Sequence, residues 1–103
     1  MDLERLREAI ESGKFEWRKH TLIRLAERNI SQDVIIEVIM KGEIVESYPH
    51  NAPFPSCLIL GWVEGKPYHV VVSFDEVSEM GYIITVYEPS LDKFESDFRT
   101  RRR

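Results

Sequence analysis

The hydrophobic positions at the start of the chain recur at the spacing of an amphipathic helix. This spacing predicts three helices, the first two over residues 2–12 and about 18–28. The third begins after Ser31 and ends at Gly42, because serine caps helix N-termini and glycine suits the position after the last turn. The apolar stripes expected to face the core are Leu3, Leu6, Ala9 and Ile10, then Leu22, Leu25 and Ala26, and then Val34, Ile35, Val38 and Ile39.

Beyond Gly42 the hydrophobic positions alternate, which is the pattern of β-strands. The predicted strands cover residues 43–48, 57–63, 68–74 and 82–88. They are joined by a loop with three prolines at residues 49–55 and by short turns at residues 64–67 and 75–81. Connections this short favour antiparallel pairing, because parallel strands need a long crossover. A short helix is expected over residues 91–98.

These elements predict an α+β fold, in which two to three N-terminal helices pack on one face of a four-stranded antiparallel sheet. A chain of 103 residues suits one domain. We place this domain at residues 1–98, and a basic C-terminal tail at residues 99–103.

The alternation also assigns residues to the two faces of the sheet. The apolar sets are Tyr68, Val70, Val72 and Phe74 in one strand and Tyr82, Ile84 and Val86 in the next. Matching them pairs residue 74 with 82 and residue 70 with 86, which places His69 across from Tyr87. The second face is then predicted to carry His69, Ser73, Thr85 and Tyr87.

Composition narrows the class of protein without assigning a function. Hydrophobic residues make up 43% of the chain and charged residues 31%, as in ordinary globular domains. No apolar run approaches the ~20 residues of a membrane helix, and the N-terminus does not resemble a secretory signal. The single cysteine, Cys57, cannot form an internal disulfide, which favours a reducing compartment. We therefore expect a soluble cytoplasmic protein that makes no membrane contact.

The net charge of −4 is unevenly distributed. Residues 99–103 contain four of the 14 basic residues, so residues 1–98 carry 10 basic against 18 acidic residues, a charge near −8. An acidic body is a poor general match to a polyanion. A local positive patch would form if the tail folded beside a second basic segment, residues 14–28. Otherwise the tail is a frayed, solvated terminus.

Two groups of residues could carry chemistry. His20, Arg24 and Arg28 follow one another at i, i+4 and i+8, so they share one side of a helix, away from its apolar stripe. A histidine beside guanidinium groups can bind phosphate and transfer a proton, although a solvated helix face has the same pattern. On the sheet, His69 beside Tyr87 is a workable acid–base pair or, alternatively, a half-buried hydrogen-bonded contact.

Metal and cofactor motifs are not evident. His20, His50, His69 and Cys57 lack the close spacing of zinc ligands. The five glycines form no phosphate-binding loop. Cys57 lies among apolar residues, which is typical of a small core residue. We expect no metal and no cofactor.

Ordered motifs run from residue 15 to residue 101. They are Phe15-Glu16-Trp17-Arg18-Lys19-His20 with Arg24 and Arg28-Asn29-Ile30, Gly42-Glu43-Ile44-Val45-Glu46-Ser47-Tyr48-Pro49, Pro55-Ser56-Cys57-Leu58-Ile59-Leu60-Gly61, Pro67-Tyr68-His69-Val70-Val71, Ile83-Ile84-Thr85-Val86-Tyr87-Glu88-Pro89, and the stretch from Phe94 to Arg101. Together they resemble a small bacterial family of domains of unknown function, numbered 4258. Lys66 and Phe94 depart from it, since Arg and Trp would also be expected there. That family is similar to RelE/ParE-like toxins, including the BrnT-type ribonuclease toxins.

The resemblance implies a RelE-like fold and a metal-independent endoribonuclease of a toxin–antitoxin pair, with RNA as substrate and a small antitoxin-like protein as partner. The candidate catalytic residues are His20 and Arg24, which the resemblance favours, and His69 and Tyr87, which their predicted geometry favours. One of the two histidines would take the proton of an RNA 2′-hydroxyl, and Arg24 would stabilise charge on the phosphate. The implied RNA-binding residues are Arg28, Tyr48, Trp62, Arg99 and Arg101, where an aromatic ring, Phe54 included, could stack on a base.

The alternative is a non-catalytic protein-binding or regulatory module on the same fold. The acidic body suits this role, and a partner would dock a helix or a strand on an exposed edge. If helix 18–28 covers the apolar face of the sheet, His20 and His69 lie apart. Only one of the two groups of residues would then form the site.

Overall fold

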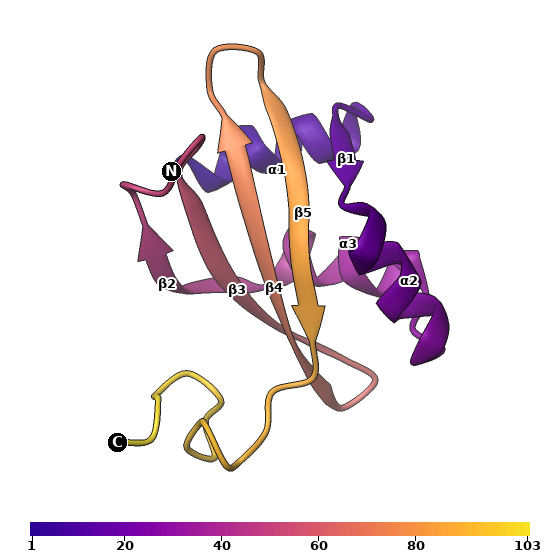
Figure 1. Cartoon of the computed structure of the whole chain (residues 1–103), viewed down its shortest axis with the longest axis vertical. Helices are drawn as coiled ribbons and strands as arrows, with labels where there is room; N and C mark the ends of the chain where they lie inside the picture. Colours follow the sequence, from indigo (N-terminus) through magenta and orange to yellow (C-terminus); the bar gives the residue numbers. More distant parts are fainter.

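The structure, a computed structural model of residues 1–103, contains three helices and one five-stranded sheet (Figure 1). In chain order the elements are α1 (Leu3–Glu11), β1 (Phe15–Trp17), α2 (Lys19–Glu27), α3 (Gln32–Lys41), β2 (Glu43–Tyr48), β3 (Ser56–Val63), β4 (Lys66–Asp75) and β5 (Met80–Tyr87). The α+β class is therefore confirmed, as are the three helices and the four predicted strands. None of the helices is long and apolar enough to cross a membrane.

The helix ends follow from local chemistry. The Asp2 side chain accepts a hydrogen bond from the backbone N–H of Arg5, and Ser31 accepts one from Asp33, so both residues are N-caps. No side chain caps α2. Its buried residues are Thr21 and Leu25, and its stripe is rotated from the predicted one.

Ala26, predicted to lie on the apolar stripe of α2, is exposed instead. The reason is the Thr21 hydroxyl, which donates a 2.6 Å hydrogen bond to the backbone carbonyl of Ile84 in β5. This bond turns the polar Thr21 inward, where its donor is satisfied. The periodicity of apolar residues could not reveal a buried hydroxyl.

The sheet has the strand order β1-β5-β4-β3-β2, so the prediction of four antiparallel strands is wrong in one respect. The added strand, β1, pairs in parallel with β5, with Phe15 opposite Gly81. Three residues are too few to show an alternating pattern. Parallel pairing is possible here because α2, α3 and three strands separate β1 from β5 in the chain.

The register between β4 and β5 contains a bulge. The predicted pairs of residues 69 with 87 and 70 with 86 are confirmed. The pair of residues 74 and 82 is wrong, because Ile84 has no partner in β4 and Phe74 pairs with Gly81. A Cβ atom on Gly81 would lie 3.0 Å from Leu6 Cδ1, so the close approach of α1 favours glycine there.

The bulge changes which residues of β5 face the core. One extra residue shifts the alternation, so Ile83 rather than Ile84 is fully buried with the core residues. Tyr82 pairs with Ser73 and therefore shares the second face with Tyr87, contrary to the predicted apolar set. The strand pattern alone gave the wrong face because it assumed an uninterrupted ladder.

One face of the sheet, called the helix face below, is covered by α1 and α3, whereas Figure 1 shows α2 beside the β5 edge. Its core includes Leu6, Ile35, Ile39, Val70 and Phe74, all almost fully buried. These residues are apolar, so burial itself stabilises them.

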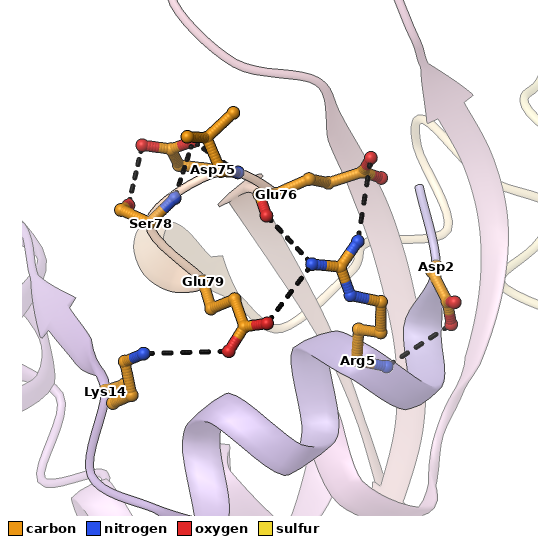
Figure 2. Close-up of polar contacts among 8 residues, drawn as sticks. Asp2, Arg5, Lys14, Asp75, Glu76, Ser78 and Glu79 are labelled. Carbon is orange, nitrogen blue, oxygen red and sulfur yellow. Dashed lines mark hydrogen bonds and ion pairs between the residues drawn. The ribbon is translucent and has the colours of Figure 1, made fainter.

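A polar network fastens the β4–β5 turn to α1 (Figure 2). The Arg5 guanidinium donates to the Glu76 carbonyl at 2.8 Å and lies 3.4 Å from the Glu79 carboxylate. Lys14 forms a further ion pair with Glu79 at 3.7 Å. Asp75 accepts hydrogen bonds within the turn, including one from the Ser78 hydroxyl. These contacts position the turn.

The second face is covered by chain without regular secondary structure. The C-terminal segment, residues 88–103, contains turns and one bridge between Phe94 and Arg101, so the short helix expected over 91–98 is not present. Phe94 is only 2% exposed. Farther along the same face, Phe54 from the loop at 49–55 stacks on Tyr82.

Candidate functional site

His69 lies at the centre of the second face and is fully buried. Its Nε2 atom is 2.7 Å from the Phe98 carbonyl oxygen, and its Nδ1 atom is 3.1 Å from the Tyr87 hydroxyl. Because a carbonyl can only accept, Nε2 carries the hydrogen of the neutral ring. Nδ1 of the neutral ring is therefore an acceptor, and the Tyr87 hydroxyl donates to it. The predicted proximity of His69 and Tyr87 is confirmed.

Burial sets the protonation of this pair. Removal from water lowers the pKa of His69, an effect partly opposed by its hydrogen bond to Phe98. Burial also raises the pKa of Tyr87. His69 is thus neutral and Tyr87 protonated near pH 7, so the proton that joins them belongs to the tyrosine.

The C-terminal segment encloses His69. The Phe94 ring meets the imidazole edge-on, with centroids 4.6 Å apart. Phe98 adopts a left-handed backbone conformation, with φ of 57°, which bulky residues rarely do. Asp97 holds this turn by accepting hydrogen bonds from the backbone N–H groups of Arg99 and Thr100. The turn directs the Phe98 carbonyl at His69.

Ion pairs attach the basic tail to β2. Arg101 donates two hydrogen bonds to the Glu46 carboxylate, at 2.7 and 3.0 Å, and these lower the pKa of Glu46. Tyr48 also donates to Glu46, and Arg99 pairs with Glu43. The tail is therefore folded against the sheet rather than frayed.

A groove of about 370 Å³ opens beside Tyr87, where the end of α2 meets the C-terminal segment. It is lined by Arg28, Tyr87, Glu88, Ser90, Lys93, Phe94 and Arg101. Arg28 and Lys93 form no ion pair, and Glu88 pairs with Lys66 outside the groove. We call this the cationic groove. Arg28 and Lys93, with Arg101 held by Glu46, can bind a phosphate beside Tyr87.

The structure separates the predicted site residues into groups. Arg28, Tyr87 and Arg101 meet in the cationic groove, with His69 directly behind Tyr87. His20 and Arg24 are exposed on α2 and do not line the groove. His20 and the buried His69 therefore do not form one site in this structure.

The remaining predicted residues lie elsewhere. The Tyr48 hydroxyl is engaged by Glu46, and Arg99 is paired with Glu43. Trp62 is 54% exposed and lines a different groove, of about 390 Å³, at the end of α3. That groove also contains Glu37 and Glu43.

Sequence reasoning missed Ser90, Lys93 and the carboxylate of Glu46. Ser90 and Lys93 belong to irregular chain, where no periodicity indicates facing. The one available signal was the resemblance motif that runs from Phe94 to Arg101, which marks the segment as more than a tail. Glu46 follows a bulge in the β2–β3 ladder. Like the bulge at Ile84, it changes the face of the sheet on which the following residues lie.

Other reactive groups lie outside this site. Burial raises the pKa of the Cys57 thiol to about 11, so it is not a thiolate near pH 7. The structure contains no group of three or more His, Cys, Asp or Glu side chains placed to hold a metal ion.

The fold and the groove define a small α+β protein with a cation-lined groove built on one end of its sheet. By sequence, the chain belongs to the DUF4258 family, described as a domain of unknown function, which matches residues 17–88. This match includes α2, His69 and Tyr87 and ends before the basic tail. No curated protein and no solved structure matches the chain. Similarity to RelE/ParE-like toxins stays a prediction.

Proposed function

We propose that the protein cleaves single-stranded RNA in the cationic groove. The observation that supports this most strongly is Tyr87, which lines a groove with Arg28, Lys93 and Arg101 and whose hydroxyl lies 3.1 Å from Nδ1 of His69. A phosphodiester bound by Arg28, Lys93 and Arg101 would place an RNA 2′-hydroxyl next to Tyr87. Fully buried His69 cannot contact RNA itself, so we assign that contact to Tyr87.

The reaction requires a proton acceptor for the 2′-hydroxyl. In our proposal this proton passes to the Tyr87 oxygen while the Tyr87 proton passes to Nδ1 of His69. The 2′-oxygen forms a bond to phosphorus, and the bond from phosphorus to the 5′-oxygen breaks. Solvent protonates the departing 5′-oxygen. The products are a 2′,3′-cyclic phosphate and a 5′-hydroxyl end.

The surrounding charges suit this role. Arg28 and Lys93 are free to stabilise the negative charge that develops on the phosphoryl oxygens. Arg101 is oriented by two hydrogen bonds to Glu46, whose carboxylate offsets its charge, so Arg28 and Lys93 supply the unpaired positive charge. After His69 accepts a proton at Nδ1, its Nε2–H still donates to the Phe98 carbonyl oxygen, which stabilises the imidazolium.

The decisive experiment incubates the purified protein with end-labelled single-stranded RNA in EDTA. Tyr87→Phe should lower kcat/KM by about 10²–10⁴-fold, the usual contribution of a proton-transfer group. Tyr68→Phe, which removes a hydroxyl from the helix face, is the matched control and should leave the rate unchanged. Undiminished cleavage by Tyr87→Phe, or none by the wild type, would refute the proposal.

A pH profile tests the part played by His69. Because only the neutral ring accepts a proton, kcat/KM should fall as pH drops through the lowered pKa of His69, which lies below the ordinary value of about 6.5. This acidic limb should be absent from the residual activity of His69→Gln. If kcat/KM of His69→Gln falls over the same pH range, the fall is due to a group other than His69.

A second candidate function is binding of a small protein partner, and the exposed Trp62 favours it. β3 extends past the last pair of β2 and β3, Glu43 with Leu60, so Trp62 and Val63 have no strand partner on that side. A partner strand could add to that edge. Co-purification with the product of a neighbouring gene, lost in Trp62→Ala, would support this function.

A further inference from the structure

The basic residues of the protein fall into two groups. Half of them form ion pairs with carboxylates, namely Arg5, Lys14, Lys41, Lys66, Arg99, Arg101 and Arg102. Those that form none include three cations on one side of α2, which are Arg18, Arg24 and Arg28, and Lys93 in the cationic groove. An acidic protein thus leaves its unpaired cations concentrated along one helix. Such a strip attracts a polyanion.

An aromatic pocket lies at the start of this strip. It has a volume of about 230 Å³ and is lined by Glu16, Trp17, Arg18, Phe54 and Tyr82. The rings of Phe54 and Tyr82 stack with centroids 5.6 Å apart and planes within 6°. The three aromatic side chains are only half-buried, so ring surface faces the solvent. Flat, partly exposed rings beside an arginine suit a nucleobase.

The bulge at Ile84 brings this pocket and the cationic groove to one face. In a regular strand, Tyr82 and Tyr87 would point to opposite faces because five positions separate them. With the bulge, Tyr82 pairs with Ser73 and Tyr87 with His69, both on the second face. The two tyrosines are about 15 Å apart along β5.

α2 connects the two places. It starts beside β5, where the Arg18 N–H donates to the Ile83 carbonyl, and it ends at Arg28 in the cationic groove. The rise from Arg18 to Arg28 is about 15 Å, which matches the separation along β5. Figure 1 shows β1 and then α2 along the edge of the sheet beside β5.

We propose that the aromatic pocket binds a nucleobase of single-stranded RNA whose backbone follows the cations of α2 into the cationic groove. Single-stranded nucleic acid combines a regular polyanion with flat bases, which is the combination that this surface offers. Glu16 at the pocket can accept a hydrogen bond from an exocyclic amino group, as cytosine carries. The inference deepens the proposed function, on which its choice of RNA rests.

The test measures binding without cleavage. A fluorescent oligo-2′-O-methylcytidylate has no free 2′-hydroxyl, so its Kd can be determined by anisotropy on the full chain. Phe54→Ala should weaken binding by roughly 5- to 100-fold, as loss of a stacking ring does. Val77→Ala, which shortens an almost fully exposed side chain in the β4–β5 turn, is the control and should retain the wild-type Kd.

Two further measurements exclude an effect of misfolding. Arg24→Gln, an exposed change, should reduce the slope of log Kd against log salt by about one, whereas Lys41→Gln on α3 should not. In a Trp62→Phe protein, which keeps an aromatic ring beside Phe98, Trp17 is the one remaining tryptophan. Its fluorescence should be quenched by the oligonucleotide with the same Kd.

The outcomes separate this inference from the proposed function. Binding that depends on Phe54 and Arg24 supports the inference even if no RNA is cleaved. RNA cleavage with an unchanged Kd in Phe54→Ala and no quenching of Trp17 overturns it while the proposed function stands. Absence of any RNA binding also overturns it and would leave the pocket to a protein partner.

Discussion

The two faces of the sheet are buried by different means. The helix face is covered by α1 and α3 and consists of apolar side chains such as Ile35 and Phe74. The second face is covered by irregular chain and contains a buried histidine with both ring nitrogens bonded. Hydrophobic burial needs no particular partner, whereas each polar atom of the second face needs one. The helix face therefore supplies stability, and the second face can hold polar side chains in a defined geometry.

The comparison predicts that the largest loss of stability follows a change on the helix face. Phe74→Ala should lower the free energy of unfolding by about 3–5 kcal/mol, because it leaves a cavity in a core that two helices hold rigid. Urea denaturation of both proteins measures this. A loss of less than half the lower end of that range would mean that the helix face is loosely packed around Phe74.

A smaller loss is expected for the equally buried Phe94 on the second face. Phe94→Ala should cost about 1–3 kcal/mol, since the C-terminal segment can detach without unfolding the sheet. The variant should expose His69, which NMR titration of its ring would detect as a pKa closer to the ordinary value. A His69 resonance that titrates as in the wild type would contradict this account.

The two faces should also respond differently to pH. Burial lowers the pKa of His69, so below about pH 6.5 the unfolded chain binds a proton that the folded protein does not. The free energy of unfolding should therefore fall as pH decreases through this window. His69→Gln should remove that slope, and His20→Gln, a change at an exposed histidine, should retain it.

The smallest effect is expected at the ion pairs of the tail. Glu46→Gln weakens the bonds to Arg101, but the arginine is about half exposed, so the loss should be about 0.5–1 kcal/mol. Added salt should reduce the difference between variant and wild type, because it screens the pair. A difference that salt does not change would show that the contribution of Glu46 is not electrostatic.

Much of the fold could be predicted from local patterns. The bounds of β2, the N-caps Asp2 and Ser31, and the pairing of His69 with Tyr87 all follow from residue type and spacing. The bulge at Ile84 could not be predicted, because it depends on how Gly81 and Ile83 fit against α1 and the core. β1 was too short to show a pattern.

The candidate site shows the same division. Spacing and resemblance indicated His69, Tyr87, Arg28 and Arg101 as candidates. They did not show that Tyr87 faces the groove while His69 is buried behind it, because the C-terminal segment that covers His69 has no periodic pattern.

The sequence by itself determined three helices, four strands and the apolar face of β4, since each depends on neighbours within a few positions. The tertiary structure alone decided that the basic tail folds onto β2 and that Arg28 and Lys93 flank Tyr87. It also decided that Tyr82 and Tyr87 share one face. These features depend on contacts between residues far apart in the chain, which one-dimensional spacing does not encode.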